Sequence, residues 1–283
     1  MENLLSYDTL KLLLNISSRY LVFTGSFYLL FYVWRKKRYW YAKIQQRYPD
    51  KKHIIREVTY SFFTVLIFGV IIMLTVIAGM KGLTPVYAPA DKYGWFYYFF
   101  SILLMILMHD TYFYWTHRLM HWKPLFKWVH RVHHLSVNPT PFAAYAFHPV
   151  EAVIEVGIIP LIAFIIPHHA TTIVIFGLYS LLMNVMGHLG YELFPKGFAS
   201  HRFFKWHNTS THHNMHHRLT RCNYGLYFNF WDRVMHTNHA TYEDSYDKVV
   251  GQREQGKLIR QSLKTEAGEP VTFEAREKVL PEA

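Results

Sequence analysis

The stretch from His109 to His134 reads HDTYFYWTHRLMHWKPLFKWVHRVHH, and six of its 26 residues are histidine. Two pairs of these histidines are four residues apart: His117 with His121, and His130 with His134. On a helix this spacing places both imidazole rings on one face, about one turn apart. A second group repeats the pattern later in the chain: His213, His216 and His217. The fold must explain why so many imidazoles gather in these short stretches.

The composition narrows the class of protein. The chain has 283 residues, a formal net charge of +11 and a single cysteine, Cys222. One cysteine excludes a disulfide framework and a thiolate zinc site, so any metal must be held by nitrogen and oxygen. A basic chain can bind nucleic acid. Here, however, the lysines and arginines flank long apolar runs, and this pattern indicates a membrane protein without a nucleic-acid partner.

Apolar runs that can cross a bilayer alternate with polar segments. Long runs cover residues 10–34, 58–80 and 93–108, and two shorter ones at 152–167 and 171–186 form a hairpin. About 20 apolar residues suffice for a spanning helix, so the hairpin is either complete or shallow. The sequence therefore predicts an all-α integral membrane protein with about four transmembrane helices.

The predicted topology brings the histidine groups to one face of the membrane. Nine basic residues lie between positions 35 and 56, and such an excess predicts a cytoplasmic loop. The histidines follow the third run and the hairpin, so they return to this same face. The predicted divisions are residues 1–57 as a transmembrane helix with a basic loop, 58–240 as a membrane domain with a cytoplasmic helical cap, and 241–283 as a cytoplasmic tail.

The histidine groups predict a centre that holds two metal ions. Neutral imidazole is a good ligand for iron, copper, nickel and zinc. Rings packed this closely would repel one another when protonated, and each needs a partner when it is buried and neutral. Eight rings are too many for one tetrahedral or octahedral ion: His117, His121, His130, His133, His134, His213, His216 and His217. Spacing alone does not separate two redox metals from two zinc ions.

Other residues are candidates to support the ligands. Asp110 lies close to two and three whole turns before the first histidine pair, so it shares their helix face and can orient a ring by a hydrogen bond. His109 lies off that face and is expected to support or pack. Glu192 follows His188 by one turn and could be a ligand, a hydrogen-bonding base or a surface residue. His148 either supports the site or caps a helix.

Six blocks of sequence occur in order between about residues 90 and 240. They are HDTYFYWTHRLMH from His109, HRVHH from His130, FHPVE from Phe147, GHLGYE from Gly187, HHNMHH from His212 and NYGLYFNFWDR from Asn223. Together they resemble the fatty acid hydroxylase/sterol desaturase superfamily. This resemblance implies a di-iron, O2-dependent membrane oxygenase that hydroxylates or desaturates a lipid, such as a fatty acyl chain, sphingolipid or sterol, at the cytoplasmic face.

The resemblance also assigns roles to residues and partners. The family's three histidine boxes correspond to the eight histidines above, and His188 matches a ligand position of some members. Glu192 stands where some relatives have another histidine, and Asp232 becomes a candidate to hydrogen-bond a ligand. Family members take electrons from NAD(P)H through a reductase and a small carrier. Because the chain has no haem, flavin or dinucleotide motif, a cytochrome or ferredoxin should be a separate protein.

Two other classes of function remain open at this point. A membrane metal transporter or sensor would place its ligands inside the spans, whereas these histidines gather at the ends of the spans. A zinc-dependent membrane hydrolase needs a general base beside the metal, and Glu192 could serve. The sequence leaves open the substrate, the carbon attacked, the oligomeric state and the choice between a bacterial inner membrane and the endoplasmic reticulum.

Overall fold

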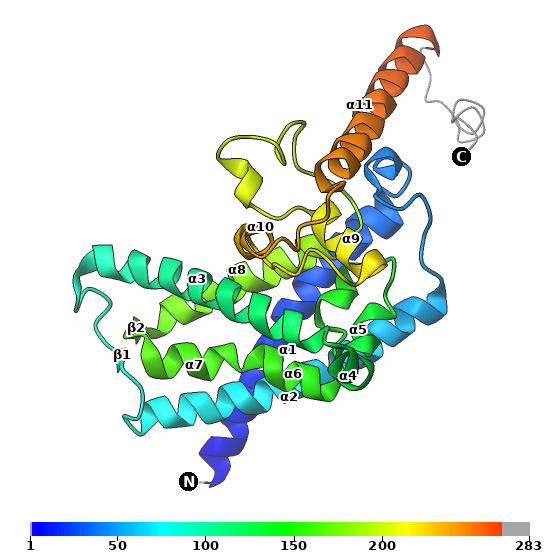
Figure 1. Cartoon of the computed structure of the whole chain (residues 1–283). Helices are drawn as coiled ribbons and strands as arrows, with labels where there is room; N and C mark the ends of the chain where they lie inside the picture. The colour runs from blue at the N-terminus through cyan, green and yellow to red at the C-terminus, as the bar shows by residue number, and fades with distance from the viewer. Residues whose placement is uncertain (1, 268–283) are drawn as a thin grey trace.

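The protein is described by a computed structural model that covers residues 2–267 (Figure 1). Its long helices are α1 (Glu2–Tyr28), α2 (Lys51–Met80), α3 (Gly94–Met120), α8 (Ala170–Gly187) and α11 (Tyr242–Ala267). Its shorter helices are α4 (Lys123–Leu125), α5 (Arg131–His134), α6 (Pro149–Val156), α7 (Ile158–Ile165), α9 (Ser210–Leu219) and α10 (Phe230–Val234). The strands β1 (Val86–Tyr87) and β2 (His168–His169) form one small sheet. The predicted all-α fold class is confirmed.

Three helices of the described chain are long and apolar enough to cross a membrane: α2, α3 and α8. Between 22% and 33% of their apolar windows is buried inside the protein, which leaves most of this surface to contact lipid. The chain is thus a multi-pass membrane protein. The predicted first span, α1, is not in this set, because Asn15, Ser17, Ser18 and Arg19 interrupt its apolar sequence.

Helix α1 nevertheless runs alongside a spanning helix. Tyr20 packs with Val65 of α2 in one core cluster, and Leu13 lies against Gly69 one turn further along. Because the earlier residue of α1 contacts the later residue of α2, the two helices are antiparallel. The buried Tyr20 hydroxyl donates to the carbonyl of Phe142 at 3.0 Å, which ties α1 to the loop that follows the histidines.

The hairpin is complete rather than shallow. Its first arm consists of α6 and α7, which are separated at Gly157, and its second arm is α8. The tip of the hairpin forms β2, which pairs in parallel with β1 through Val86 with His168 and Tyr87 with His169. Since β1 belongs to the loop between α2 and α3, the hairpin reaches the same depth as that pair of spans.

The histidine-rich segments lie at the opposite end of the bundle from this sheet (Figure 1). Helix α3 continues without a break from the apolar run to Met120, so His109, Asp110 and His117 are on one helix. Helix α8 runs back from the sheet, and His188 is its C-cap. The prediction that both histidine-rich groups reach one end of the bundle therefore agrees with the structure.

The segment predicted to be a surface tail contains a helix. The first turns of α11 bury Tyr242, Tyr246 and Val250 against Met215 of α9. Further along, Gly256 lies so close to Tyr41 that an added Cβ would collide with the tyrosine ring. Residues 268–283 of the predicted tail lie outside the described residues, and the predicted domain boundaries stay predictions.

The contact between α11 and Tyr41 can be tested with two glycines of the same helix. We expect Gly256→Ala to lower the melting temperature of the detergent-solubilised protein, because overpacking costs roughly 1–3 kcal/mol. Gly251→Ala is the matched control, since nothing lies within 4 Å of its Cβ position. It should stabilise the helix by about 0.5–1 kcal/mol. Equal effects of the two substitutions would contradict this packing.

Candidate metal centre

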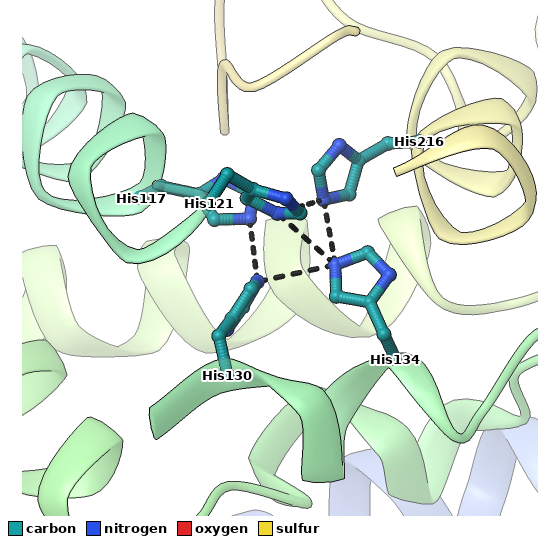
Figure 2. Close-up of side chains that lie close together, drawn as sticks. All are labelled: His117, His121, His130, His134 and His216. Atoms are coloured by element: carbon teal, nitrogen blue, oxygen red, sulfur yellow. Dashed lines mark hydrogen bonds between the residues drawn. The ribbon is translucent and has the colours of Figure 1, made fainter. Parts of the chain in front are cut away.

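Five histidines form the first histidine cluster: His117, His121, His130, His134 and His216. They come from the end of α3, from the short helices that follow it, and from α9 (Figure 2). All five Nε2 atoms point inward. The shortest Nε2–Nε2 distances are 3.0 Å between His117 and His130 and 3.0 Å between His216 and His134. The first cluster thus joins two neighbouring segments to His216, which lies 82 residues after His134.

Four histidines form the second histidine cluster: His133, His188, His213 and His217. Their Nε2 atoms also converge, at 2.9 Å for His213 with His188 and 3.2 Å for His188 with His133. The two clusters are adjacent, because the ring centroid of His134 in the first cluster lies 5.0 Å from that of His217 in the second, and that of His130 lies 5.3 Å from that of His133. All four members are buried. Together the clusters contain the nine predicted ligands.

The sequence spacing explains how the histidines divide between the clusters. Each pair separated by four residues stays together: His117 with His121, His130 with His134, and His213 with His217. This follows because side chains at i and i+4 share a helix face. The histidine that lies between the members of a pair points to a different side of its helix. His133 therefore belongs to the second cluster, and His216 belongs to the first. Each of the last two histidine boxes therefore serves both clusters.

The second ring nitrogens reveal the protonation of the site. Nδ1 of His117 donates to the carbonyl of Tyr224 at 2.8 Å, and Nδ1 of His216 donates to that of Cys222 at 2.7 Å. A carbonyl accepts only, so the proton is on Nδ1 and the Nε2 atom presents a lone pair. Lone pairs that face each other cannot form hydrogen bonds. A cation among the converging Nε2 atoms would remove this repulsion, and the arrangement fits a metal ion.

The spacing of the nitrogens also fits a metal ion. Two ligand atoms that lie ~2.1 Å from one ion and 90° apart are separated by ~3.0 Å. The shortest Nε2–Nε2 distances within the clusters are 2.9 to 3.2 Å. Neutral rings are the form that a metal binds, and burial together with the neighbouring imidazoles holds the pKa of His134 and of His213 well below its usual range. Burial likewise lowers the pKa of His188 to about 4.

Glu151 contacts a ring of the first cluster and was not among the predicted site residues. Its Oε1 lies 2.6 Å from Nδ1 of His130, and both side chains are buried. A carboxylate in this position fixes the tautomer of the ring and increases its basicity. The sequence feature that could have identified Glu151 is its place in the FHPVE block, about one turn after the helix start at His148.

Asp232 and Asp110 act on the site through the backbone of the loop that covers it. Asp232 accepts from the amides of Tyr224 and Gly225, at 2.8 and 2.7 Å. Asp110 accepts from the amides of Tyr227 and Phe228. Both carboxylates hold the segment whose Tyr224 carbonyl binds His117. The prediction was that Asp110 and Asp232 would each hydrogen-bond a ligand ring, whereas both accept from loop amides. The imidazole that faces Asp232 is that of His212, which lies 3.7 Å away and outside both clusters.

The remaining predicted residues lie outside the clusters. His109 faces the hydroxyl of Tyr227, 2.8 Å from its Nδ1, in agreement with a role away from the metal. His148 caps α6 by accepting from the amide of Val150. Glu192 is buried and accepts from the amide and hydroxyl of Thr211 near the start of α9. A carboxylate there stabilises the helix that carries three of the histidines.

Known proteins are similar to this chain across the segments that build the site. The family described as "Fatty acid hydroxylase" matches residues 102–237. A Delta(7)-sterol 5(6)-desaturase of Gibberella zeae is 28% identical over 67% of this chain and 57% of its own length. A lathosterol oxidase of Rattus norvegicus is 27% identical over 85% of this chain and 83% of its own length. A methylsterol monooxygenase of Aspergillus fumigatus is 29% identical over 58% of this chain and 54% of its own length.

No solved structure matches the chain. The family match begins within α3, ends after α10 and contains all nine histidines of the two clusters. The chain therefore belongs to the fatty acid hydroxylase/sterol desaturase family and is an oxidoreductase of that family.

Proposed function

We propose that the chain is an O2-dependent di-iron oxygenase that hydroxylates or desaturates a membrane lipid, with a sterol as the favoured substrate class. The observation that carries this proposal is the pair of adjacent, buried histidine clusters with converging Nε2 lone pairs. The similar proteins support a sterol, since they are a sterol desaturase, a lathosterol oxidase and a methylsterol monooxygenase. Iron is the proposed metal, and zinc is the substitute to be tested against it.

The chain's own residues prepare the centre for this chemistry. The nine Nε2 atoms would hold two metal ions, which when bound supply the activation of O2 for attack on a C–H bond. The Tyr224 and Cys222 carbonyls and the Glu151 carboxylate keep ring protons on Nδ1 and so leave Nε2 free. Phe113 beside His117 and Phe147 beside His133 exclude water from the membrane side.

The reaction needs an external source of electrons. Hydroxylation inserts one oxygen atom of O2 into a C–H bond, and two electrons and two protons reduce the other oxygen atom to water. Desaturation removes two hydrogens and consumes the same two electrons and two protons while both oxygen atoms become water. We propose that NAD(P)H supplies these electrons through a reductase and a separate cytochrome or ferredoxin at the cytoplasmic face.

The geometry disfavours the two alternatives. A transporter would carry ligands at mid-bilayer depth, whereas His117 lies in the last turn of α3 and His188 caps the end of α8. A zinc hydrolase would need a free carboxylate base facing the metal. The carboxylate of Glu192, the candidate base, is instead occupied by hydrogen bonds from Thr211 and Phe194.

Metal analysis tests the centre directly. Protein purified from iron-supplied cells should contain close to two iron ions per chain. We expect His216→Ala, in the first cluster, and His133→Ala, in the second, to lose metal and activity, because each removes one converging nitrogen. His201→Ala is the control, since this histidine is exposed and outside both clusters. One metal or none in the unaltered protein would refute the two-metal proposal.

Glu151 gives a second test. We expect Glu151→Gln to reduce metal affinity or activity roughly 10- to 100-fold, the usual effect of losing the carboxylate partner of a ligand histidine. Metal retention against a chelator measures the effect, and Glu254→Gln on the surface of α11 is the control. Unchanged retention in Glu151→Gln would mean that His130 does not depend on its carboxylate partner.

Lipid profiling tests the substrate class. Membranes from cells with and without the protein should differ in one lipid class by a gain of one oxygen atom or a loss of two hydrogens. With lathosterol and a methylsterol supplied to the cells, we expect the change in the sterol fraction. The His133→Ala variant should show no change, and a change confined to fatty acyl chains would reject a sterol substrate.

A further inference from the structure

Two adjacent cavities lie between the membrane helices beside the metal centre. The smaller cavity has a volume of about 130 Å³, and the larger one has about 520 Å³. Five residues line both cavities and so mark the junction between them: Ile16, Arg19, Ile72, Ile159 and Gly177. These residues come from α1, α2, α7 and α8, so the junction lies between four helices of the bundle.

The smaller cavity is the part that lies next to the metal centre. Phe113 and Phe147 line it, and their rings lie 4.9 Å from that of His117 and 5.1 Å from that of His133. The larger cavity extends to the opposite end of the bundle, where His168 of β2 lines it. A lipid that occupied both cavities would therefore have one end near the metal centre and most of its apolar body beyond the junction.

The larger cavity is accessible from the bilayer. Val76 of α2 and Val174 of α8 line it, and both side chains are exposed on the surface of helices that can span the membrane. Its volume lies within the range of roughly 300–1,000 Å³ that is typical of sites for small ligands. The body of a lipid can thus enter this cavity sideways from the membrane.

Helix α8 lines both cavities along one face. The residues that it contributes recur at helical spacing: Ala170, Ile173, Val174, Phe176, Gly177, Ser180, Leu181 and Asn184. Side chains at this spacing share one side of a helix. At a rise of about 1.5 Å per residue, the stripe from its first to its last member is ~21 Å long. Gly177 lies in the middle of this stripe, at the junction.

Gly177 leaves the junction open. A Cβ added at this position would meet no atom of another described segment within 4 Å, so neighbouring packing does not require a glycine here. Glycine in a helix interior is less stable than alanine. The other apolar residues of the junction, Ile16, Ile72 and Ile159, are β-branched and therefore stiff about their first side-chain bond. The free width of the junction thus depends on the residue at position 177.

We propose that Gly177 is the residue that admits a lipid with a rigid, ring-bearing body, such as a sterol, to the metal centre. This inference rests on the proposed function and names a residue that selects the substrate of that same site. The lipid lies along α8, and its ring system crosses the junction against the bare backbone of Gly177. A side chain at this position would occupy the space that the rings need.

The shape of the lipid determines how strongly a side chain at position 177 would interfere. A fused ring system has no freely rotating bonds between its ring carbons, so it cannot bend away from an added group. A saturated acyl chain can bend, because each of its C–C bonds has three staggered positions. Overpacking at the junction should therefore weaken the binding of a sterol much more than that of a fatty acid.

Equilibrium binding tests the proposal without requiring turnover. The probes are radiolabelled lathosterol and palmitate, each added to the full-length, iron-loaded protein in detergent. We expect the unaltered protein to bind lathosterol more tightly than palmitate. Gly177→Leu should weaken lathosterol binding about 5- to 150-fold, the range that corresponds to the usual cost of overpacking. Palmitate binding should change less than about 3-fold, because the chain can bend around the new side chain.

Gly25→Leu is the matched control. Gly25 lies inside α1, the space around its Cβ position is likewise open, and it is not among the residues that line the two cavities. Both substitutions replace a helical glycine with a strong helix former, so neither should lower the melting temperature. Iron content is measured for each variant. A loss of lathosterol binding at constant iron content and melting temperature then reports on the junction and not on folding.

The outcomes distinguish this inference from the proposed function. Selective loss of lathosterol binding in Gly177→Leu, without any sterol oxidation by the unaltered protein, would support the role of Gly177 and reject the proposed reaction. Sterol oxidation combined with unchanged lathosterol binding in Gly177→Leu would reject the role of Gly177 alone. An equal loss for lathosterol and palmitate, or an unaltered protein that does not prefer lathosterol, would also overturn the inference.

Discussion

The rest of the structure depends on the convergence of neutral imidazole nitrogens at distances near 3 Å. These Nε2 atoms carry lone pairs, because the ring protons of His117 and His216 are donated from Nδ1 to backbone carbonyls. Such an arrangement is repulsive without a cation and stable with one. The fold therefore has to hold the rings together from outside, and it does so with buried carboxylates, helix ends and a loop rather than with contacts among the rings.

Each support lies on a different part of the chain. Glu151 holds a ring directly, whereas Asp232 and Asp110 hold the loop that provides the Tyr224 carbonyl. Glu192 lies near the start of α9, the helix that carries the last histidine box. The membrane helices deliver the remaining rings, because α3 and α8 both end at the same side of the bundle. Metal binding, helix packing and membrane topology are thus parts of one arrangement.

The apolar cavities continue this logic into the membrane. The phenylalanines beside His117 and His133 separate the metal centre from a space that only apolar material can fill at low cost.

The sequence by itself determined the class of fold, the family and the set of nine clustered histidines. It could do so because apolar run lengths, i to i+4 spacing and motif order are local properties of a chain. Only the tertiary structure decided that His133 and His216 leave their sequence neighbours to join the other cluster, that the hairpin reaches the β1 strand, and that Glu151 rather than Glu192 contacts a ring. These outcomes depend on the direction in which each short helix points, and packing between distant segments sets that direction. The same holds for Asp232, whose partner is a loop amide and not the expected histidine.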